Sequence, residues 1–271
     1  MMKKALVILI LCLGCSKSSD PGSSTIPTPS TGATTGGGTS TGGTTTPSTG
    51  ATSEVPSHFK LIYGASKITS DGTYVTIEAT GAPDHKSVYY ATNSSLYETF
   101  SGKTYNGLNF AKNPNSISTG LYTFKIPVKP VAATNVTATP LSAIGISLNG
   151  VPFYNQYAGP NQPLTGEMAS FDQYYGHPAP GGKYHYHVEP LYLTTVKKDK
   201  MALLGFLLDG FPVYGPWENG KAVTNANLDV LHGHTHATTE FPAGIYHYHI
   251  TQEDPYINGN GFYGTPGTVS Q

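Results

Sequence analysis

Histidines at alternate positions are the residues of this chain best suited to chemistry. The tetrapeptide Tyr184-His185-Tyr186-His187 recurs as Tyr246-His247-Tyr248-His249, and His232-Gly233-His234-Thr235-His236 lies between the two copies. Because successive side chains of a strand point to opposite faces, each tetrapeptide places two imidazoles on one face and two tyrosines on the other. A His-x-His pair can bind one ion through both rings, at ~2.0–2.1 Å per Zn–N bond.

We therefore predict a transition-metal site. The candidate ligands are His185, His187, His232, His234, His236, His247 and His249. Three nearby residues are candidates to hydrogen-bond the ligand rings and so fix their orientation, namely His177, Asp172 and Asp229. His177, the equivalent of His234, is alternatively a ligand itself. Imidazoles without a thiolate favour copper or zinc as the ion. A structural role, with imidazoles bonded to carbonyls and tyrosines in the core, is the alternative for any single pair.

The same imidazoles leave other functions open. A metal ion with a free coordination position would support a hydrolase or an oxidase, with Glu189, Asp209 or Glu240 as the base. A metal-independent glycan-binding or adhesion module is a further possibility, because several aromatic residues between Phe153 and Trp217 could stack on sugars. Residues 58–271 contain no Gly-x-Ser-x-Gly motif that could hold a serine nucleophile. Metal binding is the leading hypothesis.

The tetrapeptides close the two halves of an internal duplication, at about 144–190 and 204–250. Residues 144–154 align with 204–214, and residues 172–177 align with 229–234. Asn149-Gly150 and Asp209-Gly210 predict hairpin turns at equivalent places. We expect the halves to pack around a pseudo-two-fold axis that brings the two His-x-His strands together, with the histidines forming one shared site or two separate ones. Because the second half has more histidines, we favour it if function is asymmetric.

These blocks resemble the YHYH domain family. The resemblance is carried by the doubled tetrapeptide, by Leu148 to Pro152, by Leu208 to Gly215, by His232 to His236 and, more loosely, by Thr80 to His85. It covers roughly residues 81–267, most of the chain after its N-terminal segment. It implies a domain of that family and no settled activity.

The N-terminus reads as an export signal. Lys3 and Lys4 precede an apolar stretch that is too short to span a bilayer, which predicts a signal peptide over residues 1–14. Leu13-Gly14-Cys15 resembles a bacterial lipobox, although Cys12 stands where an aliphatic residue is usual. The resemblance implies acylation of Cys15, a membrane as partner and a cell-envelope location, the outer membrane in a diderm cell because Ser16 follows. The alternative is an ordinary secretory signal.

Composition sets the fold class and excludes one class of partner. Residues 15–57 are rich in Ser, Thr, Gly and Pro, which predicts a disordered tether, and residues 58–271 remain as one domain. Short β-rich runs with frequent Gly and Pro, and no long window of helical periodicity, predict an all-β, sandwich-like fold. The chain has no arginine, so we expect no nucleic-acid partner. A small-molecule or glycan ligand is left open.

Overall fold

The structure is a computed structural model that describes residues 52–271. The signal peptide predicted over 1–14, the acylated Cys15 and most of the predicted tether lie outside the described residues. The end of that tether joins the fold, because the backbone N–H of Ser53 donates to the carbonyl of Ser70 at 2.9 Å. The folded domain therefore begins before the predicted boundary at residue 58. Among residues 52–271, no helix combines the length and apolar character needed to cross a membrane.

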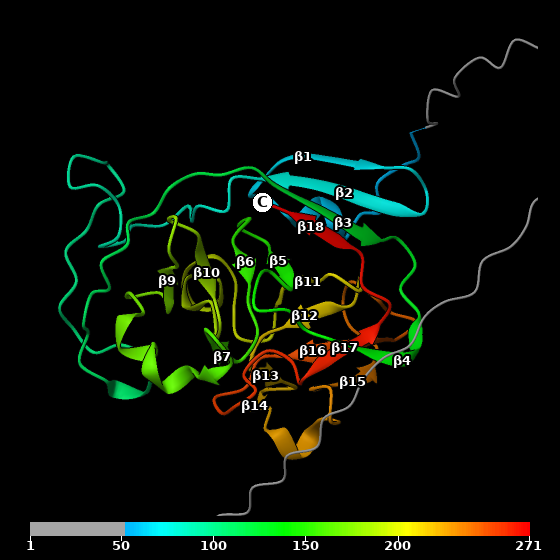
Figure 1. The fold of residues 1–271 in the computed structure, drawn as a ribbon. Helices are drawn as coiled ribbons and strands as arrows, with labels where there is room; N and C mark the ends of the chain where they lie inside the picture. Colours follow the sequence, from blue (N-terminus) through cyan, green and yellow to red (C-terminus); the bar gives the residue numbers. More distant parts are fainter. Residues whose placement is uncertain (1–51) are drawn as a thin grey trace, which may run out of the picture. The chain divides into compact units, whose positions relative to one another are not determined.

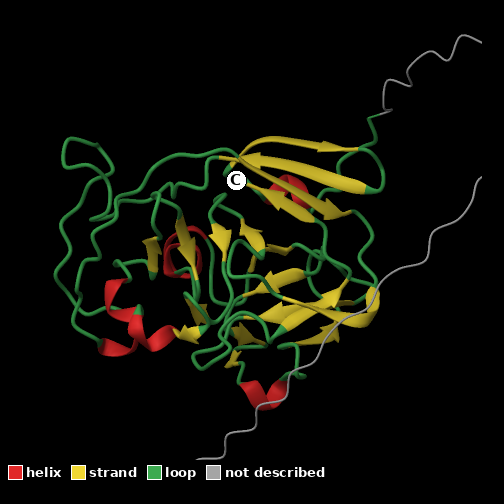
Figure 2. Cartoon of the chain, in the orientation of Figure 1, coloured by secondary structure: helices red, strands yellow, loops and turns green. Residues whose placement is uncertain are grey.

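Strands dominate the described residues, and the helices are single short turns (Figure 2). The strands are β1 (Ala65–Ser70), β2 (Tyr74–Ala79), β3 (Tyr122–Pro127), β4 (Ala132–Ala138), β5 (Gly145–Ser147), β6 (Pro152–Phe153), β7 (Tyr157–Ala158), β8 (Gln162–Pro163), β9 (Gly176–Pro178), β10 (Tyr184–Tyr186), β11 (Leu203–Leu207), β12 (Pro212–Tyr214), β13 (Trp217–Glu218), β14 (Lys221–Ala222), β15 (Gly233–His236), β16 (Ile245–His249), β17 (Gly261–Gly264) and β18 (Thr268–Ser270). The helices are η1 (Phe59–Leu61), η2 (Tyr105–Gly107), η3 (Leu164–Gly166), η4 (Met168–Ser170), η5 (Leu193–Lys197) and η6 (Asn225–Asn227). The all-β prediction is confirmed.

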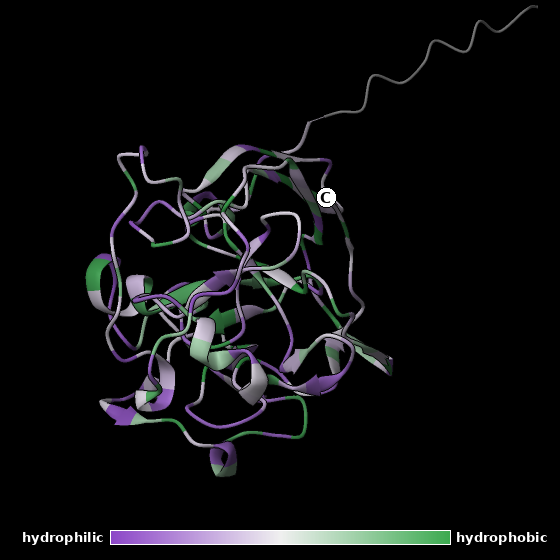
Figure 3. Ribbon diagram, turned by 60° about the vertical axis from the view of Figure 1, so that its left-hand side comes forward, coloured by the Kyte–Doolittle hydropathy of each residue, from purple (hydrophilic) through white to green (hydrophobic). Residues whose placement is uncertain are grey.

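A four-stranded antiparallel sheet, in the order β1-β2-β3-β18, covers one side of the core (Figure 1). Its strands alternate as half-buried strands do: Val75 and Ile77 of β2 and Phe124 of β3 are buried, while the residues between them are more exposed. These apolar side chains join those of the larger sheet in one hydrophobic core. The most apolar segments lie along the central strands in Figure 3.

An eight-stranded mixed sheet carries the duplication, in the order β15-β16-β12-β11-β5-β6-β10-β9. The two central strands, β5 and β11, are antiparallel, and every residue in them is buried. Ile146 of β5 pairs with Phe206 of β11, and these two residues occupy equivalent positions of the aligned halves. The pseudo-two-fold axis therefore passes between Ile146 and Phe206.

The predicted hairpin turns are confirmed and join the inner strands of each half. Gly150 and Gly210 both have positive φ, +81° and +88°, where glycine meets no steric penalty. A Cβ on Gly150 would also lie 2.6 Å from the carbonyl oxygen of Gly64. One turn joins β5 to β6, and the other joins β11 to β12. Strand β6 then pairs in parallel with the His-x-His strand β10, and β12 pairs in parallel with the His-x-His strand β16.

The symmetry places the two His-x-His strands far apart, so the expectation that they meet is wrong. Strands β12, β11, β5 and β6 lie between β16 and β10. At about 4.8 Å per strand spacing, β10 and β16 are roughly 24 Å apart. The reason is that the wholly buried strands of each half occupy the sheet centre, which pushes the histidine strands outward. The two His-x-His strands therefore cannot share one metal site.

Candidate metal centres

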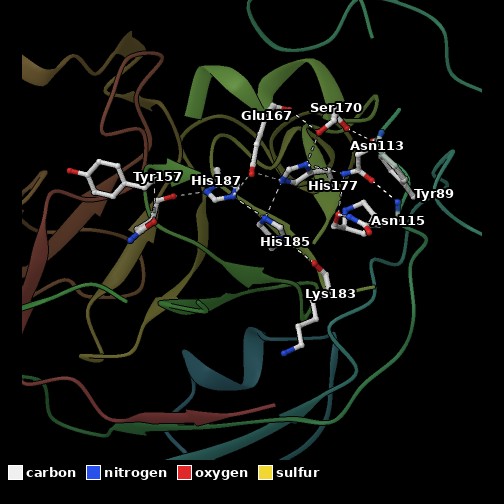
Figure 4. A network of polar contacts seen from close by, with 12 residues as sticks. Tyr89, Asn113, Asn115, Tyr157, Glu167, Ser170, His177, Lys183, His185 and His187 are labelled. Atoms are coloured by element: carbon white, nitrogen blue, oxygen red, sulfur yellow. Dashed lines mark hydrogen bonds and ion pairs between the residues drawn. The ribbon is translucent and has the colours of Figure 1, made fainter. Parts of the chain in front are cut away.

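Three histidines of the first half converge on one point, seen in Figure 4. The Nε2 atom of His185 lies 3.1 Å from Nε2 of His177 and 2.9 Å from Nε2 of His187. His177 lies on β9 directly opposite His185 on β10, and His187 follows on the same face as His185. All three side chains are buried. Strand pairing and strand alternation together thus bring three ring nitrogens within contact of one another.

The opposite ring nitrogen of each histidine is held in place. Nδ1 of His185 donates to the carbonyl of Lys183 at 2.8 Å, and Nδ1 of His187 donates to the carbonyl of Asn155 at 2.5 Å. Because a carbonyl only accepts, these contacts assign the ring proton to Nδ1 and leave Nε2 with a free lone pair. Nδ1 of His177 contacts Oγ of Ser170 at 2.7 Å. Metal-binding histidines are commonly fixed through the second ring nitrogen in this way.

Glu167, between η3 and η4, completes the first cluster. Its Oε2 atom lies 3.6 Å from Nε2 of His177 and 4.0 Å from Nε2 of His187. Ligands about 2.0–2.1 Å from a tetrahedral ion are roughly 3.3 Å from one another. The three histidine nitrogens lie within 4.8 Å of one another and therefore suit the binding of one ion, and Glu167 lies beside two of them.

The second half repeats the arrangement. Nε2 of His234, on β15, lies 3.1 Å from Nε2 of His247, the residue opposite it on β16. Oε1 of Glu218, on β13, is 3.5 Å from Nε2 of His234 and 3.8 Å from Nε2 of both His247 and His249. His236 adds a further nitrogen, since its Nδ1 lies 2.8 Å from Oε1 of Glu218. Donor atoms of Glu218, His234, His236 and His247 thus lie within 4.8 Å of one another, and His249 adjoins them through Glu218.

The backbone fixes the rings of the second cluster as it does those of the first. Nδ1 of His247 donates to the carbonyl of Ile245 at 3.0 Å, and Nδ1 of His249 donates to the carbonyl of Gly215 at 2.8 Å. Ile245 and Gly215 are the equivalents of Lys183 and Asn155. Nε2 of His249 is buried and has no hydrogen-bond partner. An orphaned lone pair of this kind is costly unless a cation or a proton donor occupies the space in front of it.

Burial keeps these imidazoles neutral. It lowers the pKa of His187 to about 4, against the opposing effect of the hydrogen bond to Asn155. Burial lowers the pKa of His247 to about 4 as well, with the neighbouring histidines adding to the effect. The pKa values of His177 and His185 fall well below the ordinary value for the same reasons. Neutral imidazole is the form that binds metal ions.

The two carboxylates differ in their electrostatics. Burial raises the pKa of Glu167, and the hydrogen bond from the backbone of Gly159 only partly opposes this shift. Burial also acts to raise the pKa of Glu218, but the hydrogen bond with His236 and the nearby histidines outweigh it, and the net shift is downward. Glu218 is therefore the stronger negative centre of the two.

Each cluster lines an open cavity. The first cavity, about 620 Å³, is lined by all three histidines, Glu167 and Tyr154, among others. The second, about 810 Å³, is lined by His236, His247, His249, Glu218 and Trp217, among others. An ion in either cluster would therefore be reachable by a small ligand.

The structure sorts the predicted site residues into ligand and support positions. Six predicted ligands, His185, His187, His234, His236, His247 and His249, lie in the two clusters. His177, predicted as an orienting residue or a ligand, presents its own Nε2 to the first cluster. His232 lies outside the second cluster: it has a φ of +71° in the turn before β15, and its Nε2 contacts Oγ1 of Thr251 at 2.9 Å.

Asp172 and Asp229 bind tyrosines where the sequence predicted that they would bind imidazoles. Oδ2 of Asp172 accepts from the hydroxyl of Tyr184 at 2.9 Å, and Oδ1 of Asp229 accepts from the hydroxyl of Tyr246 at 2.9 Å. The reason is strand alternation, because these carboxylates face the tyrosine side of β10 and β16. Asp172 also accepts a backbone N–H of the turn before β9, and Asp229 accepts one at the start of β15. Each carboxylate therefore fixes the turn that positions a candidate ligand, His177 or His234.

Glu167 and Glu218 lie at the clusters although neither is among the site residues predicted from the sequence. The two glutamates come from non-equivalent segments, the η3–η4 turns in one half and the β13–β14 hairpin in the other. The alignment of the halves therefore gives no signal for them. The proposed bases have other partners: Glu189 accepts from Thr194, Asp209 from Tyr248, and Glu240 from Tyr214.

Comparison with known proteins agrees with this architecture. The family model described as YHYH protein matches residues 123–225 and 217–261, a span that contains both histidine clusters and both glutamates. No curated protein and no solved structure matches the chain. On the strength of a match that covers half of its length, with both tetrapeptides inside it, the chain belongs to the YHYH protein family.

Proposed function

We propose that this protein is a cell-envelope lipoprotein that binds two transition-metal ions, copper or zinc, one in each half of its β domain. The observation that carries the proposal is the contact between Nε2 of His185 and Nε2 of His187 at 2.9 Å. Both rings carry their proton on Nδ1, so two lone pairs face each other in a buried place. A shared cation in front of them removes this repulsion and satisfies both nitrogens.

The donor chemistry supports copper or zinc. Imidazole and carboxylate groups suit Cu(II) and Zn(II), and no thiolate is available, because the only cysteines, Cys12 and Cys15, precede the domain. Three imidazoles around one point suit a four-coordinate zinc site, in which Glu167 or water would be the fourth ligand. The second cluster has four mutually close donors and His249 beside Glu218, which suits the larger coordination number that Cu(II) accepts.

Metal content measured by elemental analysis tests the proposal. After reconstitution and removal of loose ions, the protein is expected to hold two equivalents of zinc or copper. His185→Ala and His247→Ala are each expected to hold one, and the double variant none. His58→Gln, a histidine outside both clusters, is the matched control and is expected to hold two. A content below about a tenth of an equivalent in the parent protein, under conditions where Zn(II) sites of this kind are filled, contradicts the proposal.

Membrane attachment rests on the sequence alone and is proposed on that basis. The Leu13-Gly14-Cys15 motif supports acylation of Cys15, and several acyl chains hold a protein firmly on a membrane. Metabolic labelling with an alkyne fatty acid is expected to mark the parent protein and not Cys15→Ser. Labelling of both to the same extent contradicts acylation at this position.

Catalysis at the same ions is the second candidate function, and the open cavities favour it. Glu167 lines the first cavity beside the histidines, and Glu240 lines the second, so each cavity has a carboxylate that could serve as a base. A hydrolase or an oxidase would show turnover that a chelator abolishes and that Zn(II) or Cu(II) restores. Tyr154 and Tyr157 also line the first cavity, so a glycan array run with and without chelator tests the metal-independent alternative.

A further inference from the structure

The two clusters differ at one position that the symmetry makes directly comparable. Ala179 follows His177 by two residues, as His236 follows His234. The surrounding backbone is the same: the N–H of Ala179 donates to the carbonyl of Lys183, and His236 pairs with Ile245, the equivalent of Lys183. The second half therefore carries an additional imidazole where the first half has a methyl group.

This additional imidazole is the exposed donor of the second cluster. The side chain of His236 is 47% exposed, whereas those of His247 and His249 are 1% and 2% exposed. In the first cluster, the exposed fractions of His177 and His187 are 4% and 3%. Among the histidines of the two clusters, His236 is thus the one that an ion in solution meets first.

His236 is held beside a carboxylate at the boundary between two cavities. Its Nδ1 contacts Oε1 of Glu218, and both side chains line the second cavity and also a third of about 500 Å³, which His234 lines too. The same carboxylate oxygen lies within 3.8 Å of the buried nitrogens of His247 and His249. An ion bound by His236 and Glu218 would therefore need only a small displacement to reach the buried nitrogens.

We infer that His236 and Glu218 form the entry point for metal in the second half. The inference rests on the proposed metal binding and adds a route to it. The negative charge of Glu218 attracts a hydrated divalent cation, which first exchanges water for a carboxylate oxygen of Glu218. It then exchanges a second water for Nδ1 of His236, whose proton passes through solvent to Nε2 of the same ring. It then exchanges its remaining water for Nε2 of His234, His247 and His249. Each step replaces one metal–ligand bond by another, with no change of oxidation state for Zn(II).

Loading kinetics in single-site proteins test this route. His185→Ala retains only the second site and His247→Ala only the first. Each metal-free protein is mixed with a zinc–indicator complex, and the rate of zinc transfer to the protein is followed by the indicator colour. The second site is expected to load about tenfold faster than the first or more, a size comparable to effects of groups around metal sites.

Two further variants separate an entry role from a merely structural one. In the protein with only the second site, His236→Ala is expected to load zinc about tenfold more slowly than its parent. In the protein with only the first site, Ala179→His is expected to load faster than its parent, because Ala179 lines the first cavity and leaves room for a ring.

The outcomes distinguish the inference from the function on which it rests. Single-site proteins that take up no zinc contradict metal binding itself. Zinc uptake at both sites with equal rates, or a His236→Ala variant that loads as fast as its parent, overturns the entry role and leaves metal binding standing. Where His236→Ala retains no zinc, the Ala179→His result decides: an unchanged loading rate overturns the inference.

Discussion

At the scale of single residues, the proton position on each imidazole determines what the clusters can do. Backbone carbonyls hold Nδ1–H of His185, His187, His247 and His249, so each ring presents a lone pair at Nε2. Burial keeps the rings neutral at physiological pH. The protein thus holds its candidate donor atoms in position without an ion, which would lower the reorganisation that the proposed metal binding requires.

The buried Asp209 makes the free energy of unfolding depend on pH. Asp209→Asn is expected to abolish this contribution. Burial raises the pKa of Asp209 from 3.8 to about 6, against hydrogen bonds from Tyr248, Gly264 and Phe211. The folded state therefore binds its proton more tightly than the unfolded state does. The stabilisation is fully present below pH 4, is lost as the pH rises to about 6, and amounts to about 3 kcal/mol.

Urea unfolding of the metal-free proteins at pH 4 and pH 7 checks this prediction. The equivalent position in the first half is an asparagine, Asn149. The Asp209→Asn substitution nevertheless removes an acceptor, because Oδ2 of Asp209 accepts from both Tyr248 and Gly264. The readout is therefore the difference between the two pH values and not the absolute stability. A parent-minus-variant difference in the free energy of unfolding that is the same at both pH values contradicts the raised pKa.

At the scale of elements, strands β10 and β16 divide two tasks between their faces. One face presents histidines to a cluster, and the other presents tyrosine hydroxyls to buried polar groups: Tyr184 to Asp172 and Tyr248 to Asp209. Tyr186 contacts Nε2 of His85 at 3.0 Å. The tyrosine face thus anchors each strand in the core, and the histidine face is free to bind an ion.

Tyr184→Phe is expected to separate the two tasks. It removes a hydrogen bond to the fully buried Asp172 carboxylate, so the free energy of unfolding should fall by about 1–3 kcal/mol. Because the hydroxyl points away from His185 and His187, the zinc content should stay at two equivalents. Denaturant unfolding and elemental analysis measure the two quantities. Loss of one equivalent of zinc without loss of stability would contradict this division of the faces.

The sequence predicts much of each element and little of how the elements meet. The alternation of Tyr and His predicted the two faces of β10 and β16, and the aligned blocks predicted the hairpins at Gly150 and Gly210. The sheet order was not predicted, although the apolar run of β11 favours a central, buried place for it. Glu167 could not be found, because an acid on a short irregular turn carries no periodic pattern and has no counterpart in the other half.

At the scale of the whole molecule, the pseudo-two-fold axis makes the two clusters separate compartments. They lie on opposite ends of one sheet whose centre, β5 and β11, is wholly buried. Within the described residues, no ligand of one cluster contacts a ligand of the other. Because a coupling free energy needs an element that both sites bias, the clusters are expected to bind their ions independently.

Trp217, the single tryptophan of the chain, can report this independence. It adjoins Glu218 on β13 and lines the second cavity, whereas the first cluster lies beyond the sheet centre. Cu(II) quenches indole fluorescence only at short range. In a titration of the parent protein, one equivalent of Cu(II) should quench the Trp217 fluorescence, and the other equivalent should leave it unchanged. Plotted against free Cu(II) concentration, the quenching curve of His185→Ala should have the same midpoint as that of the parent. His247→Ala should weaken the quenching strongly. A midpoint that shifts in His185→Ala would show that the two compartments communicate through the sheet, and would require β5 and β11 to move when the first ion binds.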